Sequence, residues 1–69
     1  MGAERASAQK LNFAKQIATD AADARAGKNV ALSVRLLEKA RNRCEEIIRT
    51  YPKTKAAQEA RRLLKELEQ

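Results

Sequence analysis

The chain has 69 residues, of which 15 are lysine or arginine, 9 are aspartate or glutamate and none is histidine, so its formal net charge is +6. Histidine is the commonest general base and the commonest metal ligand in proteins, and a single cysteine cannot form a disulfide within the chain. These absences argue against an enzyme, and we expect neither a cofactor nor a metal ion. A chain of this length makes one small domain, so residues 1–69 form either a whole small protein or a piece of a larger one.

The sequence contains no apolar run of the length that a membrane span needs, which is about 18 to 20 residues. Its first ten residues, MGAERASAQK, lack the apolar core of a signal peptide. The chain as given is therefore predicted to be cytoplasmic. A periplasmic or envelope location stays open for a parent protein from which a leader has been removed.

The first helical pattern covers residues 3–26 and is rich in alanine. Its apolar arc consists of Ala6, Leu11, Phe13, Ala14, Ile17, Ala18, Ala21, Ala22 and Ala24. Alanine favours the helix but buries little area, because its side chain is a single methyl group. We therefore expect this helix to dock closely only around Leu11, Phe13 and Ile17.

The connection over residues 27–29 predicts a tight hairpin. Gly27 follows the last periodic residue and suits the left-handed position that ends many helices. Asn29 stands where the next helix needs an N-cap, since its side chain can accept a hydrogen bond from a free backbone amide. A connection this short joins two antiparallel helices.

The central helical pattern covers residues 30–51. Its apolar residues recur at spacings of three, four and seven, and they are Val30, Val34, Leu37, Cys44, Ile48 and Tyr51. These spacings place side chains on one face of a helix, and we expect this face to meet the core. Ala40 and Ile47 widen the stripe, and Leu36 lies at its margin.

A proline separates the central pattern from the last one. Pro52 has no amide hydrogen and disfavours helical geometry in the residue before it, so the central helix should end near Thr50 or Tyr51. Thr54 then suits an N-cap, and a third helix is predicted over residues 54–68. The predicted fold is all-α, with an antiparallel helical hairpin and a third helix packed against its open end.

The stretch CEEIIRTYPKTKAAQEARRLLKEL resembles the join between two tetratricopeptide repeats. In that family the second helix of a repeat closes with a small, a bulky and a small residue followed by a proline. Those spacings are occupied here by Ala40, Cys44, Ile47 and Pro52. The resemblance covers residues 40–67 and is closest in form to repeats of bacterial envelope scaffolds. It implies helices that present their surfaces to other proteins, although the helix over residues 30–51 is about two turns longer than in a standard repeat.

Two features are candidate sites. Arg35, Lys39 and Arg43 are spaced by four residues, which predicts a basic ridge on the outer side of the central helix. Leucines near this ridge and on the third helix exceed what three helices can hide, and the candidate partner-binding residues are Leu32, Leu36, Leu63, Arg35, Lys39 and Arg43. Cys44 lies within the apolar stripe, so we expect a small buried hydrophobe rather than a reactive thiol. In a homodimer along this stripe, a disulfide between chains is the alternative.

These patterns predict a non-enzymatic protein–protein interaction or scaffold module, whose partner is another protein or a second copy of the chain. The alternative is a small basic nucleic-acid-binding protein, because the net charge and the ridge can contact phosphates. Glu38, Glu45 and Glu46 lie beside the ridge and dilute its charge. The chain has only one phenylalanine and one tyrosine, so it lacks a stacking platform for single strands.

Overall fold

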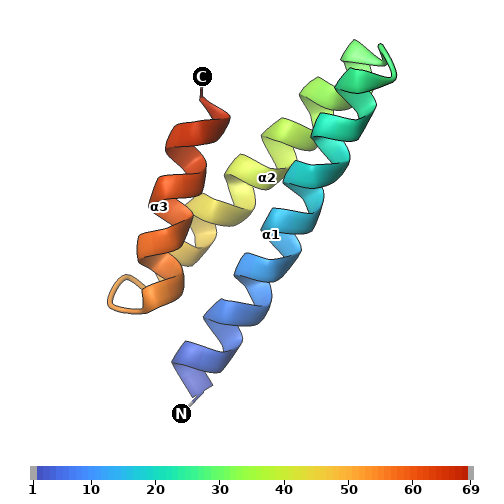
Figure 1. The fold of residues 1–69 in the computed structure, drawn as a ribbon. Helices are drawn as coiled ribbons and strands as arrows, with labels where there is room; N and C mark the ends of the chain where they lie inside the picture. The colour runs from blue at the N-terminus through green and yellow to red at the C-terminus, as the bar shows by residue number, and fades with distance from the viewer. Residues whose placement is uncertain (1, 69) are drawn as a thin grey trace.

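The computed structural model describes residues 2–68 and contains three helices and, over that range, no strand (Figure 1). The helices are α1 (Gly2–Ala26), α2 (Val30–Thr50) and α3 (Lys55–Leu67). The all-α prediction is confirmed, and every helix begins and ends within one residue of its predicted range. The predicted domain also includes Met1 and Gln69, which lie outside the described residues.

The helices α1 and α2 form an antiparallel hairpin, and α3 covers only part of it. Lys10 of α1 pairs with Glu46 of α2. Phe13, three residues further along α1, lies against Arg43, three residues earlier on α2, so the two helices run in opposite directions. At 1.5 Å per residue α1 is about 37 Å long and α3 about 20 Å. Figure 1 shows α3 beside the half of the hairpin that holds the N-terminus, far from the connecting turn. The hairpin tip, residues 20–36, is therefore only two helices thick.

The core is built mainly from alanine. The buried apolar residues are Leu11, Ala14, Ile17, Ala21, Ala40, Cys44, Ile47, Ala56, Ala57 and Ala60, so six of these ten are alanine. Seven of them form the cluster in which all three helices meet: Leu11, Ala14, Cys44, Ile47, Ala56, Ala57 and Ala60. Methyl side chains allow helices to approach closely, because little bulk separates the two backbones. The largest fully buried side chains are Ile47, Cys44 and Ser7.

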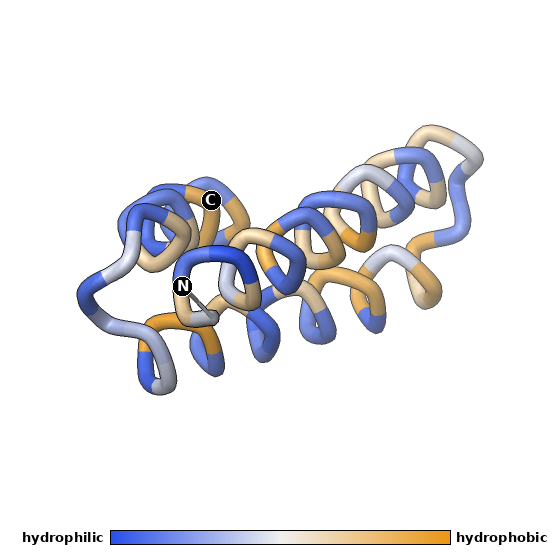
Figure 2. Tube along the Cα trace, turned by 90° about the horizontal axis from the view of Figure 1, so that it is seen from below, coloured by the Kyte–Doolittle hydropathy of each residue, from blue (hydrophilic) through white to orange (hydrophobic). Residues whose placement is uncertain are grey.

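Three large apolar side chains that were predicted to face the core are exposed instead. The exposed fraction is 65% for Val30, 53% for Val34 and 55% for Phe13. On α2 the buried face follows Ser33, Ala40, Cys44 and Ile47, so it is rotated away from the predicted stripe. The valines fall on an edge of α2 that α3 is too short to reach. Figure 2 shows hydrophobic and hydrophilic residues alternating along the whole hairpin.

The turn between α1 and α2 differs from its prediction in one residue. Lys28, not Gly27, takes the left-handed conformation, with a φ of 65°. The Asn29 amide donates to the Ala24 carbonyl at 2.8 Å, and the Lys28 amide donates to the Arg25 carbonyl at 2.9 Å. This pair of hydrogen bonds is a Schellman motif in which the left-handed residue comes second after the helix. The prediction for Gly27 was therefore wrong by one position.

The two predicted N-caps are confirmed. The side-chain oxygen of Asn29 accepts from the Leu32 amide at 3.3 Å, and the hydroxyl of Thr54 accepts from the Ala57 amide at 3.1 Å. The same Thr54 hydroxyl donates to the Tyr51 carbonyl at 2.8 Å, so it ties the start of α3 to the end of α2. Capping hydrogen bonds satisfy amides that the first turn of a helix leaves free.

Replacing Lys28 with glycine is expected to stabilise the fold. A residue with a Cβ is strained in the left-handed region by about 1 kcal/mol, whereas glycine is not. Lys28→Gly should therefore raise the free energy of unfolding by about 1 kcal/mol above that of Lys28→Ala, which removes the same charge but keeps the strain. Urea denaturation measures the difference. Equal stabilities of the two variants would contradict this account of the turn.

Enlarging an alanine between α1 and α2 is expected to destabilise the fold. Ala40 is fully buried, so Ala40→Leu should lower the free energy of unfolding by about 1 to 3 kcal/mol through overpacking. Ala31 is exposed on the same helix, and Ala31→Leu should change the free energy of unfolding by less than about 0.5 kcal/mol. Thermal and urea denaturation of both variants provide the test. A well-folded Ala40→Leu variant of unchanged stability would show that the two helices are not in close contact there.

Candidate interaction surface

Five of the six predicted partner-binding residues lie on α2, and four of them share one edge of the helix. Leu32, Leu36, Lys39 and Arg43 follow one another at spacings of four, three and four residues. Arg35 lies beside them, and together these five residues occupy an arc of about 100° around α2. We call this arc the basic edge. Arg35 and Lys39 are exposed, Leu32 is 42% exposed, and Leu36 and Arg43 are half-buried.

An aromatic side chain from α1 joins the basic edge. The guanidinium carbon of Arg43 lies 5.5 Å from the centroid of the Phe13 ring. This distance is within the range of a cation–π interaction, in which the face of the ring attracts the charge. The ring of Phe13 stays more than half exposed despite this contact. The cation of Arg43 is thus held against α1 rather than free in solvent.

Phe13 was predicted to face the core, although the helical period indicates a surface position. Residues two apart differ by about 200° around a helix, so Leu11 and Phe13 cannot both face the core. The structure buries Leu11, at 3% exposure, and leaves Phe13 outside. The apolar arc predicted for α1 was too wide because it included both Leu11 and Phe13.

The cations of the basic edge have no acidic partner in the part of the chain that the structure describes. The ion pairs present there join Lys10 to Glu46 at 3.4 Å and Lys15 to Glu59 at 3.6 Å. Both pairs are exposed, so each contributes little to stability. Arg35, Lys39 and Arg43 belong to neither pair, and the charge of the basic edge is left uncompensated by direct contacts.

The sixth predicted residue, Leu63, lies apart from the basic edge. It packs against the core from α3 and is half-buried. With four neighbours on α1 and α3, it lines a shallow cavity whose residues are Lys15, Glu59, Arg62, Leu63 and Glu66. The ion pair between Lys15 and Glu59 stands among these lining residues. The structure therefore separates Leu63 from the other candidates.

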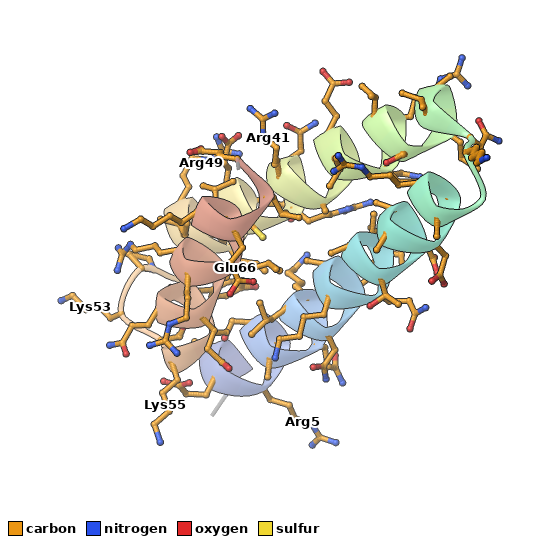
Figure 3. All side chains as sticks on the ribbon, turned by 45° about the horizontal axis from the view of Figure 1, so that its top comes forward. Arg5, Arg41, Arg49, Lys53, Lys55 and Glu66 are labelled. Atoms are coloured by element: carbon orange, nitrogen blue, oxygen red, sulfur yellow. The ribbon has the colours of Figure 1, made fainter. Side chains whose placement is uncertain are left out.

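A second exposed edge of α2 carries the valines. Val30, Val34, Leu37 and Arg41 follow at the same spacings of four, three and four residues, and we call them the valine edge. Arg41 and Arg49, which is also on α2, point away from the helices (Figure 3). Glu38 and Glu45 are exposed close to this edge in the helical period. Charges of both signs therefore border the valines, whereas Glu46, the acidic residue of α2 within the arc of the basic edge, is paired with Lys10.

Cys44 is buried, as predicted. Its exposed fraction is 0%, and it belongs to the cluster in which the three helices meet. Burial raises the pKa of the Cys44 thiol, and the neighbouring Glu45 carboxylate raises it further. A buried thiol with a raised pKa forms little thiolate, which is the reactive species. The thiol therefore acts here as a small hydrophobic side chain.

The described residues contain no group of three histidine, cysteine, aspartate or glutamate side chains placed to hold a metal ion. None of the three helices is long and apolar enough to cross a membrane. Comparison with protein-family models, with curated proteins and with solved structures finds no match for this chain. The candidate surface therefore has to be interpreted from its own chemistry.

The raised pKa of Cys44 predicts that stability falls at alkaline pH. Above its ordinary value of 9.0, the thiol ionises in the unfolded chain but stays protonated in the folded one. The unfolded state then binds fewer protons, so the free energy of unfolding decreases with pH, by at most about 1.4 kcal/mol per unit. The contribution of the Cys44 thiol to the free energy of unfolding is fully present below the pKa that the thiol has in the unfolded chain.

Urea denaturation of the wild type and of Cys44→Ala, at several pH values from about 8 to about 10, measures this contribution. The variant loses the thiol, so its stability should decline less steeply, whatever its absolute value. All other ionisable side chains are common to both proteins, so the difference between the two profiles isolates Cys44. Parallel pH profiles would contradict the assignment to Cys44.

Proposed function

We propose that the chain is a non-enzymatic protein–protein interaction or scaffold module of tetratricopeptide-like type. The observation that carries the proposal is the exposure of large apolar side chains on the hairpin: Val30, Val34 and Phe13 are more than half exposed, and Leu32 is 42% exposed. Three of these four belong to the tip that α3 leaves uncovered. These side chains lie along the two edges of α2 that flank its contact with α1, and exposed apolar surface of this kind is typical of interaction sites.

The packing of the repeat-like segment supports the tetratricopeptide-like part of the proposal. Ala40, Cys44 and Ile47, which stand at the closing positions of such a repeat, are all fully buried. α2 ends at Thr50 just before Pro52, and α3 then packs back on α2. In a repeat array, each helical pair covers the apolar side of its neighbour. A further helix, a partner protein or a second copy of the chain would cover the valine edge in the same manner.

The second candidate function is that of a small basic nucleic-acid-binding protein. It is favoured by the net charge of +6 and by the unpaired cations of the basic edge. Against it stand the leucines between those cations, which phosphates do not require. Nucleic-acid binding would show itself as an affinity for duplex or single strands that falls steeply with salt concentration.

The interaction proposal predicts that a surface variant loses association without losing stability. The double variant Leu32→Glu, Val34→Glu changes exposed side chains, so its free energy of unfolding should stay within about 0.5 kcal/mol per substitution of the wild type. Sedimentation over a wide concentration range and retention of proteins on the immobilised chain measure association. The wild type should associate with itself or retain a protein that the variant loses.

The matched control is Asn42→Glu, Gln58→Glu, which adds the same charge at exposed polar positions. This control should associate and retain proteins as the wild type does. Any protein retained on the immobilised wild-type chain should bind to it again after purification. A wild-type chain that stays monomeric and retains nothing that the double variant loses would refute the proposal.

A further inference from the structure

We infer that the basic edge of α2 is the docking site for an acidic amphipathic helix of a partner protein. The inference rests on the proposed function and names the surface and the chemistry of the partner. Three properties of the edge carry it: two leucines followed by two cations along one line, the absence of acidic partners for those cations, and the contact of Arg43 with the Phe13 ring.

The geometry of the edge matches that of a helix. Leu32, Leu36, Lys39 and Arg43 rise along α2 at spacings of four, three and four residues. A bound helix presents its own anchors at the same spacings, so it can make apolar contacts with the two leucines and charged contacts with the two cations along one shared line. Leu32 and Arg43 are 11 positions apart, which at a rise of 1.5 Å per residue is about 17 Å, or three helical turns.

The charge of the edge selects an acidic partner. Arg35, Lys39 and Arg43 take part in no ion pair with residues 2–68. Glu46 lies in the same arc of α2, but Lys10 pairs with it at 3.4 Å and cancels its charge. On α1, Asp20 is near this face in the helical period and accepts a hydrogen bond from Gln16 at 3.2 Å. The sum over these groups is positive, so carboxylates are attracted and other cations are repelled.

The contact between Arg43 and Phe13 prepares one of the cations for binding. The ring holds the guanidinium 5.5 Å from its centroid, which restricts the side chain before a partner arrives. The ring has no hydrogen-bond acceptor in its plane, so the N–H groups of the guanidinium can still donate two parallel hydrogen bonds to one carboxylate. Less side-chain freedom is then lost on binding than for an unrestrained cation.

The valine edge and nucleic acid fit these observations less well. Glu38 and Glu45 border the valine edge along with Arg41, so it has no preferred sign of charge. Phosphates would use the cations of the basic edge but leave Leu32 and Leu36 without a role. A helix with acidic and apolar side chains uses both kinds of group.

The probe for the experiment is a synthetic helical peptide of about five turns, with leucines at helical spacing and glutamates elsewhere. Its binding is measured by fluorescence anisotropy and mapped by NMR chemical shifts on the full chain. We expect shifts centred on Leu32, Leu36 and Lys39. We also expect at least tenfold weaker binding to Arg35→Glu, Lys39→Glu, while both partners remain folded.

The matched control variant is Arg41→Glu, Arg49→Glu, which makes the same change in net charge on another side of α2. It should bind the peptide within about twofold of the wild type, apart from the long-range effect that salt screens. Two control peptides complete the design: one has lysine in place of every glutamate, and one has alanine in place of every leucine. Both should bind at least tenfold more weakly than the probe.

Three outcomes would overturn the inference. Equal losses in the two double variants would mean that only net charge matters. Tighter binding of the alanine peptide or of a DNA duplex, mapped to the same residues, would assign the edge to anions in general or to nucleic acid. Absence of peptide binding, in a chain that still associates through Leu32 and Val34, would remove the acidic helix and leave the proposed function standing.

Discussion

The close contact of α1 with α2 along small side chains is the constraint on which the rest of the structure depends. Ala14, Ala21 and Ala40 are essentially fully buried, and Ser33 replaces a hydrophobic residue near the tip. Helices joined by methyl groups come close together but bury little apolar area per turn. The larger buried side chains, such as Leu11 and Ile47, lie at the end of the hairpin that α3 covers. There Ala56, Ala57 and Ala60 of α3 complete the cluster.

This constraint decides where the large apolar residues of α2 go. Towards the tip Ser33 and Ala40 are the buried residues of α2, and the valines and Leu32 stand on the two edges that flank them. Where α3 is present, it covers one of these edges with Ile48 packed beneath it. Towards the tip nothing in residues 2–68 covers either edge. The surface proposed for interaction thus follows from the packing of the core and from the short length of α3.

The ends of the helices were predictable from the sequence because they depend on neighbouring residues. The buried face of each helix was not, because it depends on packing against distant residues. Asn29, Pro52 and Thr54 each act through the backbone beside them, so the ends of all three helices were predicted within one residue. The buried face of α2 depends on which neighbour is close, and the pattern of hydrophobic residues gave the valines a place in the core that Ser33 and Ala40 occupy. The left-handed residue was also misplaced, because the Schellman hydrogen bonds, rather than glycine alone, determine that Lys28 adopts it.

The candidate site was predictable in part for the same reason. Regular spacing along one helix is a property of the sequence, and it brought five of the six candidates together on α2. Contacts between helices cannot be seen in the sequence. The position of Phe13 against Arg43 and the half-burial of Leu63 could therefore only come from the structure. The surface that combines leucines, unpaired cations and an arginine held against a ring lies outside the buried core, and its exposed apolar atoms add little to the stability of a protein with so small a core. The partner proposed here would account for this composition, because binding can bury exposed apolar groups and pair uncompensated charges.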